Sequence, residues 1–205
     1  MATSASPQTG IYYAQHVGRG TTLVVDNDGV LDMSSGTARL PAVLRQGVIN
    51  FGLNEAWEVS SADSLNALTS GTNPSIGRIN AGTDPAWRIR WASGAGNADP
   101  VQFNAFMPPD VSTAPGMTIS VYGEGSSANA ENKLNIAVFF GVGDANAGAS
   151  GGQLTSSPTL QSITVASGDI ITNVPVTVVL TPSSAHASGP IDLYGLRAVY
   201  TKVTS

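Results

Sequence analysis

Apolar and polar residues alternate along most of the chain after residue 85, and this pattern restricts the fold to β-structure. The longest uninterrupted apolar face runs through Leu134, Ile136, Val138 and Phe140, with a polar or small residue at most positions between them. Because successive side chains of a strand point to opposite faces, a period of two predicts half-buried strands. Eight segments qualify as strands: 56–59, 87–91, 101–105, 118–121, 134–140, 163–165, 174–180 and 191–203.

The stretches between these segments are rich in Gly, Pro, Asn, Asp and Ser, which supply turn geometry. They contain no helical period, so the strands are expected to follow one another through short loops. We predict an all-β protein, an antiparallel jelly-roll sandwich of about eight strands with an N-terminal extended β arm or stem. Strand count alone does not separate a jelly roll from an immunoglobulin-like sandwich.

Two late strands, 174–180 and 191–203, carry apolar residues on both faces. In the closing strand, Leu193 and Val199 fall on the face opposite to the other large apolar residues. A sandwich strand with an apolar outer face usually meets another subunit or a covering arm, and we favour a subunit. The predicted interface residues are Val179, Tyr194, Leu196 and Tyr200.

Residues 1–55 lack a core of their own and are predicted to form a leader followed by an attachment arm, whereas 56–205 form the sandwich. The arm contains two glycine-started units, 20–26 and 29–35, which read equally as stacked rungs or as one β-hairpin turning at 26–29. Either arrangement needs a partner surface to bury its apolar residues. The predicted capsid or partner attachment residues are Leu23, Val25, Leu31 and Met33.

Charge is sparse, and it excludes several classes of function. Nine Lys and Arg against 14 Asp and Glu give a net charge of −5, which argues against nucleic-acid binding. The chain has no cysteine, and we expect neither a signal sequence nor a membrane-inserted segment. Only 11% of residues are charged, against about 25% in typical domains, so we expect copies of the chain or a larger assembly to cover much of the surface.

No group of residues has the pattern of a catalytic or metal site. The two histidines, His16 and His186, stand apart from any nucleophile motif, and Glu55, Glu58 and Asp63 read as solvated charges rather than an acid–base pair. We therefore predict no enzyme, no catalytic residue, no cofactor and no metal.

Two further motifs have a functional and a structural interpretation. The segment 26–29 shares part of a calcium-loop spacing but lacks the later ligands. Trp87 and Trp91 would be able to stack on a sugar if they were exposed, but their alternation with arginines favours packing in the core.

An ordered series of short motifs carries a family resemblance. The series is Trp57, 68–71 with Pro74, 82–84, 88–91, 107–110, 140–148, 178–182 with His186, 193–195 and 199–201. In this order the segment 56–203 resembles a family of β-sandwich proteins encoded by tailed bacteriophages. The resemblance implies a virion structural protein, a homotrimer with a jelly-roll head and an N-terminal attachment segment, and it carries over no catalytic residue.

On this basis we expect a capsid decoration (cement) or head-fibre protein that binds the outer capsid surface as a trimer and stabilises it. Its expected partners are other copies of itself and the major capsid protein or another virion protein, and its expected location is the virion. The alternative is a tail-fibre or receptor-binding module in which exposed loops such as 143–152 or 181–190 recognise a host surface glycan. The third hypothesis is an enzyme, a depolymerase on the same scaffold.

Overall fold

The computed structural model describes most of the chain after residue 45 and short pieces before it. The described residues are 15–16, 22–25, 31–32, 46–60, 64–79, 86–94, 96, 98–126, 131–183 and 189–203. The chain divides into two compact units, Met1–Leu44 and Arg45–Ser205, and each is considered by itself. The predicted leader, Met33, Asp63, His186 and the 82–84 motif lie outside the described residues.

The described part of the first unit is a small antiparallel sheet. It contains β1 (Gln15–His16), β2 (Thr22–Val25) and β3 (Leu31–Asp32), in the order β1-β2-β3. Leu23 lies opposite Gln15, and Val25 lies opposite Leu31. The antiparallel pairing of β2 with β3 is that of a hairpin, rather than of rungs stacked with Thr22 over Leu31. The backbone of the predicted attachment residues Leu23, Val25 and Leu31 therefore belongs to this sheet.

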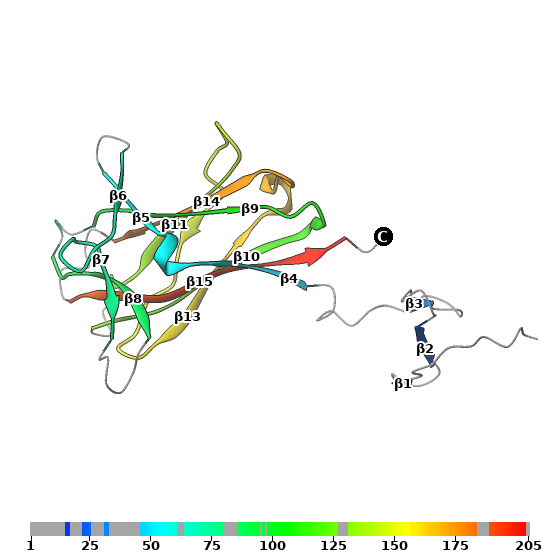
Figure 1. Cartoon of the computed structure of the whole chain (residues 1–205), viewed down its shortest axis with the longest axis horizontal. Helices are drawn as coiled ribbons and strands as arrows, with labels where there is room; N and C mark the ends of the chain where they lie inside the picture. The colour runs from blue at the N-terminus through cyan, green and yellow to red at the C-terminus, as the bar shows by residue number, and fades with distance from the viewer. Residues whose placement is uncertain are drawn as a thin grey trace, which may run out of the picture. The chain divides into compact units, whose positions relative to one another are not determined.

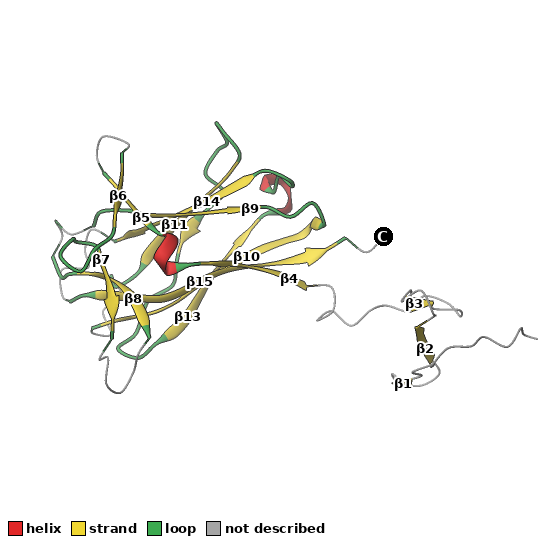
Figure 2. Ribbon diagram, viewed as in Figure 1, coloured by secondary structure: helices red, strands yellow, loops and turns green. Residues whose placement is uncertain are grey.

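The second unit is a sandwich of two sheets (Figures 1 and 2). The first sheet contains, in spatial order, β13 (Thr159–Val165), β10 (Val111–Gly125), β15 (Ile191–Lys202), β8 (Trp87–Trp91) and β7 (Ser75–Arg78), and β4 (Gln46–Phe51) also pairs with β15. The second contains β12 (Ala149–Ser150), β11 (Leu134–Phe140), β14 (Pro175–Pro182), β9 (Val101–Phe106), β5 (Trp57–Val59) and β6 (Leu65–Ala67).

Every described strand pair is antiparallel, so the predicted all-β jelly-roll sandwich is confirmed. Each of the eight predicted segments contains a strand, and the structure adds β4, β6, β7 and β12. In the part of the chain that the structure describes, two short 3-10 turns, Leu53–Glu55 and Ser167–Asp169, connect strands without forming a helical layer. Among the described residues, no helix is long or apolar enough to cross a membrane.

The core lies between the two sheets and is built from the inward rows that the sequence pattern predicts. Ile119 on β10, Phe103 on β9 and Val138 on β11 are fully buried in one apolar cluster. Trp91 is also fully buried, and its indole Nε1 donates a hydrogen bond to the Asp99 carbonyl at 2.8 Å. The core position predicted for Trp91 is thus correct. Trp87 is exposed, because it begins β8 at the edge of the core.

β4 moves the boundary between arm and sandwich toward the N-terminus. It pairs with β15 from Gln46 opposite Thr201 to Phe51 opposite Leu196, and it buries its inward side chains against the core. Gly47 permits this pairing, because a Cβ there would lie 2.0 Å from Cζ of Tyr200. The expected division into 1–55 and 56–205 is therefore corrected to one between Leu44 and Arg45.

A β-bulge in the closing strand corrects the predicted interface. The β10–β15 ladder shifts register at this point, from Tyr122 opposite Gly195 to Gly123 opposite Leu193, which leaves Tyr194 as the extra residue. Beyond the bulge the inward phase changes, so Leu196 (4% exposed) and Tyr200 (6%) lie in the core of their own chain. They are not available to a neighbouring subunit. Val179 and Tyr194 are half-buried on outer faces.

Candidate functional site: a groove on the outer face of the first sheet

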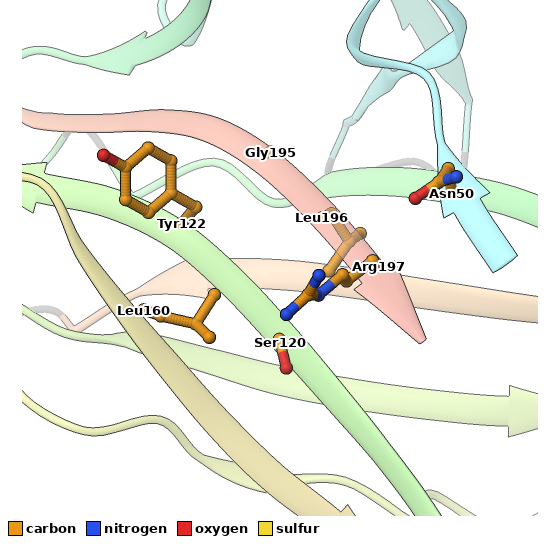
Figure 3. Close-up of a pocket in the computed structure, with 7 residues that line it drawn as sticks. All are labelled: Asn50, Ser120, Tyr122, Leu160, Gly195, Leu196 and Arg197. Atoms are coloured by element: carbon orange, nitrogen blue, oxygen red, sulfur yellow. The ribbon is translucent and has the colours of Figure 1, made fainter. Parts of the chain in front are cut away.

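The outer face of the first sheet carries a groove where β4, β10, β13 and β15 lie side by side. We call it the outer groove; Figure 3 shows the side chains that line its cavity of about 420 Å³. The lining residues are Asn50, Ser120, Tyr122, Leu160, Gly195, Leu196 and Arg197. They come from four segments far apart in the sequence, and the ladders of the sheet bring them together.

Strand register sets the order of side chains across the outer groove. In one row, Tyr122 lies opposite Leu160 on β13 and opposite Gly195 on β15. In the next outward-facing row, Arg197 lies between Ser120 on β10 and Asn50 on β4. Directly opposite residues on one face are close enough for their side chains to touch a common ligand. The groove therefore has an aromatic and aliphatic row beside a polar row.

Gly195 keeps the first row open. A Cβ at this position would meet only Cβ of Tyr122, at 4.0 Å, so the space beyond the backbone is empty. Its backbone does not require glycine, since its φ lies outside the left-handed region. The missing side chain thus exposes one side of the Tyr122 ring without any demand from the fold itself.

The apolar wall of the groove is held in place from behind. Tyr122 is 44% exposed, which is high for a side chain on an interior strand, and Leu160 on the edge strand β13 is 51% exposed. The Tyr122 ring packs on the Tyr194 ring with centroids 6.0 Å apart, and the Tyr194 hydroxyl donates a hydrogen bond to Glu124. Burial, together with this hydrogen bond, raises the pKa of Tyr194 well above its ordinary value, so the hydroxyl keeps its proton.

An ion-pair network fixes the adjoining part of the same face. The buried carboxylate of Asp192 accepts hydrogen bonds from Arg90 Nε at 2.7 Å, Arg90 Nη2 at 2.6 Å and Arg88 Nη1 at 3.2 Å. The hydrogen bond to Asp192 raises the pKa of Arg90, because it stabilises the charged guanidinium. Both arginines are therefore engaged in ion pairs within the sandwich. They hold β8 against β15 beside the groove.

Two of the three side chains in the polar row are exposed to solvent. Arg197 is exposed and forms no ion pair with any described residue. Asn50 is exposed opposite it, whereas the Ser120 hydroxyl is buried and shares a 2.8 Å hydrogen bond with the Ser162 hydroxyl. A guanidinium and a side-chain amide at one edge of an apolar groove are able to fix the orientation of a polar ligand.

A second hollow lies near the beginning of β8. Its cavity of about 260 Å³ is lined by Asn54, Ala56, Trp57, Ala67, Leu68, Ile76 and Trp87. Trp57 and Trp87 are both exposed, so the prediction of core packing is wrong for Trp87. In this tryptophan cleft, exposed aromatic rings again meet a concave surface. No charged residue is among those that line it.

The acidic residues considered in the sequence do not converge among the described residues. Glu55 is exposed on the 3-10 turn and Glu58 is half-buried on β5, and neither lines the outer groove. Within the part of the chain that the structure describes, no three His, Asp or Glu residues are grouped to hold a metal ion. Among the described residues, the acidic side chains therefore form no cluster at the outer groove.

No family model matches the sequence, and no curated protein matches it. Similar solved structures include the xylan-binding module CBM15, with 16% identity, a TM-score of 0.45, and coverage of 78% of this chain and 99% of that one. CBM35 from Cellvibrio japonicus Abf62 is similar at 11% identity and a TM-score of 0.44, with coverage of 78% and 100%.

A third similar structure is the CBM36-1 domain of a multidomain xylanase from the hindgut metagenome of Trinervitermes trinervoides, at 14% identity and a TM-score of 0.41, with coverage of 73% and 98%. Values this low assign no function to the chain.

Proposed function

We propose that the sandwich is a glycan-binding module and that the outer groove is its binding site. One observation carries this proposal: an exposed aromatic ring and an aliphatic wall lie beside an unpaired guanidinium and an amide, on one rigid sheet. A sugar ring has an apolar face of C–H groups and an edge of hydroxyls. The face suits Tyr122 and Leu160, and the edge suits Asn50 and Arg197.

The size and rigidity of the groove agree with this proposal. Its cavity of about 420 Å³ falls within the range of roughly 300–1,000 Å³ that is typical of small-molecule sites. Tyr122 needs little ordering on binding, because Tyr194 already backs its ring. A preformed aromatic surface reduces the entropy that a ligand must overcome.

Glycan-array binding with the full chain tests the proposal. Tyr122→Ala is expected to weaken binding about tenfold, because it removes the stacking surface. Phe106→Ala is the matched control, since Phe106 is an exposed aromatic residue on β9 of the second sheet, away from the groove. Thermal melting verifies that both variants are folded. Binding that survives Tyr122→Ala and is lost in Phe106→Ala would place the site elsewhere.

We further propose that this module belongs to a bacteriophage virion, as the resemblance of the 56–203 motifs implies, and that it recognises a host surface glycan there. In this role the groove supplies recognition and residues 1–44 supply attachment to the particle. Electron microscopy of phage labelled on this chain, combined with adsorption of the purified protein to host cells, tests the assignment. Absence from the particle, or purified protein that does not adsorb, would contradict it.

Capsid decoration as a homotrimer is the second candidate, and exposed apolar side chains on the same face favour it. Val48 on β4 is exposed next to half-buried Val199 on β15, in the row beyond Arg197. Another copy of the chain would bury this row. Light scattering at micromolar concentration distinguishes the two functions. A wild-type trimer that Val48→Asp dissociates supports decoration. If the wild type and Val48→Asp are both monomers, the result supports glycan binding by the single chain.

A further inference from the structure

We infer that the ligand of the outer groove is an acidic glycan, with a sugar carboxylate that pairs with Arg197. This inference rests on the proposed function and adds the charge of the ligand. It starts from the contrast between Arg197 and the other two arginines on the same face. Arg88 and Arg90 neutralise Asp192, whereas Arg197 has no carboxylate within 4.0 Å among the described residues.

The outer face of the first sheet carries a small positive charge, although the chain as a whole is negative. Register places three arginines on it, Arg88, Arg90 and Arg197, against two acids, Glu124 and Asp192, so the face carries 3 − 2 = +1. The whole chain carries −5. Both acids are engaged, Asp192 by two arginines and Glu124 by the Tyr194 hydroxyl. The charge left without a partner on this face is that of Arg197.

The geometry around Arg197 suits a carboxylate rather than a hydroxyl alone. A guanidinium offers parallel N–H donors that match the two oxygens of a carboxylate. Asn50 lies directly opposite Arg197 in the ladder, but Figure 3 shows the guanidinium extending away from Asn50, so the guanidinium itself is the donor for the carboxylate. Figure 3 shows the Arg197 side chain reaching over Ser120 toward the row of Tyr122 and Leu160. A sugar ring stacked on Tyr122 would thus present a ring carboxylate to the guanidinium.

The net charge of −5 does not oppose this pairing at short range. At physiological ionic strength, exposed charges are screened beyond about 8 Å, so the groups that line the groove decide the local field. No acid is among the lining residues. Added salt is therefore expected to weaken binding of an acidic glycan moderately, as for one ion pair.

The test uses the full chain and matched ligands: galacturonate, glucuronate and sialate oligosaccharides, each beside its carboxyl-reduced neutral counterpart. Titration calorimetry is expected to give at least tenfold weaker binding for the neutral form of the recognised sugar. Arg197→Gln is expected to remove this preference, and Arg197→Lys to retain part of it. Lys202→Gln is the control, because it removes one exposed cation from the same strand outside the groove.

Gly195→Phe provides a second variant that fills the groove from below. The open space at Gly195 predicts that this variant folds, and melting verifies it. Loss of acidic-sugar binding in both Arg197→Gln and Gly195→Phe supports the inference. Equal binding of acidic and neutral forms, lost only in Gly195→Phe, overturns the acidic ligand and leaves the glycan site standing. Failure of every sugar to bind overturns both.

Discussion

Asp192→Asn tests the network that holds the outer face together. Asp192 accepts three hydrogen bonds from two arginines, and its side chain is only 4% exposed. Asparagine keeps the shape and one acceptor, but its NH₂ faces an arginine N–H, so at least one charge-assisted bond is lost and two donors are brought together. Each such bond contributes about 1.5–3 kcal/mol.

Solvent reduces this loss, because the side chains of Arg88 and Arg90 are 23% and 38% exposed and are able to recover hydration. A fully buried pair broken on one side costs about 3–5 kcal/mol. We therefore expect a decrease of about 2–3 kcal/mol in the free energy of unfolding. For a domain of this size, that corresponds to a melting temperature lower by roughly 5–10 °C.

Urea unfolding followed by circular dichroism measures this change, with Asp169→Asn as the control. Asp169 is exposed on the 3-10 turn, so its variant is expected within about 0.5 kcal/mol of the wild type. If Asp192→Asn also remained within that limit, the network would not stabilise the face. A double variant with Arg90→Gln measures the coupling and is expected to cost less than the sum of the single changes.

Three further predictions concern the boundary, the core and the pH response. The segment 45–205 is expected to have the same melting temperature as the full chain. The segment 56–205 lacks β4 and is expected to elute as an aggregate on gel filtration. If the two segments melted and eluted alike, the boundary between Leu44 and Arg45 would be wrong. Phe103→Ala removes a buried ring whose centroid lies 6.4 Å from that of Phe51. Urea unfolding is expected to show a free energy of unfolding lower by about 3–5 kcal/mol. Because the pKa of Tyr194 is raised in the folded state, its stabilising contribution is complete below the unfolded pKa of about 10 and is lost as the pH rises above it. In urea unfolding, the free energy of unfolding of Tyr194→Phe is therefore expected to decline less steeply above that pH than that of the wild type. Parallel pH dependences of the two proteins would refute this expectation.

Alternation predicted the strands of the sandwich well, because burial between two sheets imposes a period of two on every inward row. The 134–140 segment became β11 with the predicted apolar face buried. β4 has no such signal, because Val48 is exposed and Gly47 is buried, which reverses the usual pattern of apolar residues inside and small residues outside. Gly47 is buried because the Tyr200 ring fills the place of its side chain, a long-range contact that no local pattern contains.

The bulge explains why the predicted interface and the observed groove differ. A uniform alternation through the closing strand places Leu196 and Tyr200 outward, but one extra residue at Tyr194 turns them into the core. The groove itself has no linear signal, because the register of four strands decides that Arg197 lies between Asn50 and Ser120. Exposure of a lone tyrosine or arginine is visible only once the sheet is assembled.

The pairing of β4 with β15 has a practical consequence. Gln46 begins the first strand of the sandwich and lies opposite Thr201, near the end of the last strand, so the two ends of the unit leave it about 5 Å apart. A unit with neighbouring ends is suited to circular permutation and to grafting into a surface loop of a host protein. Residues 45–203 are thus expected to work as a transplantable cassette that displays the outer groove on an unrelated scaffold.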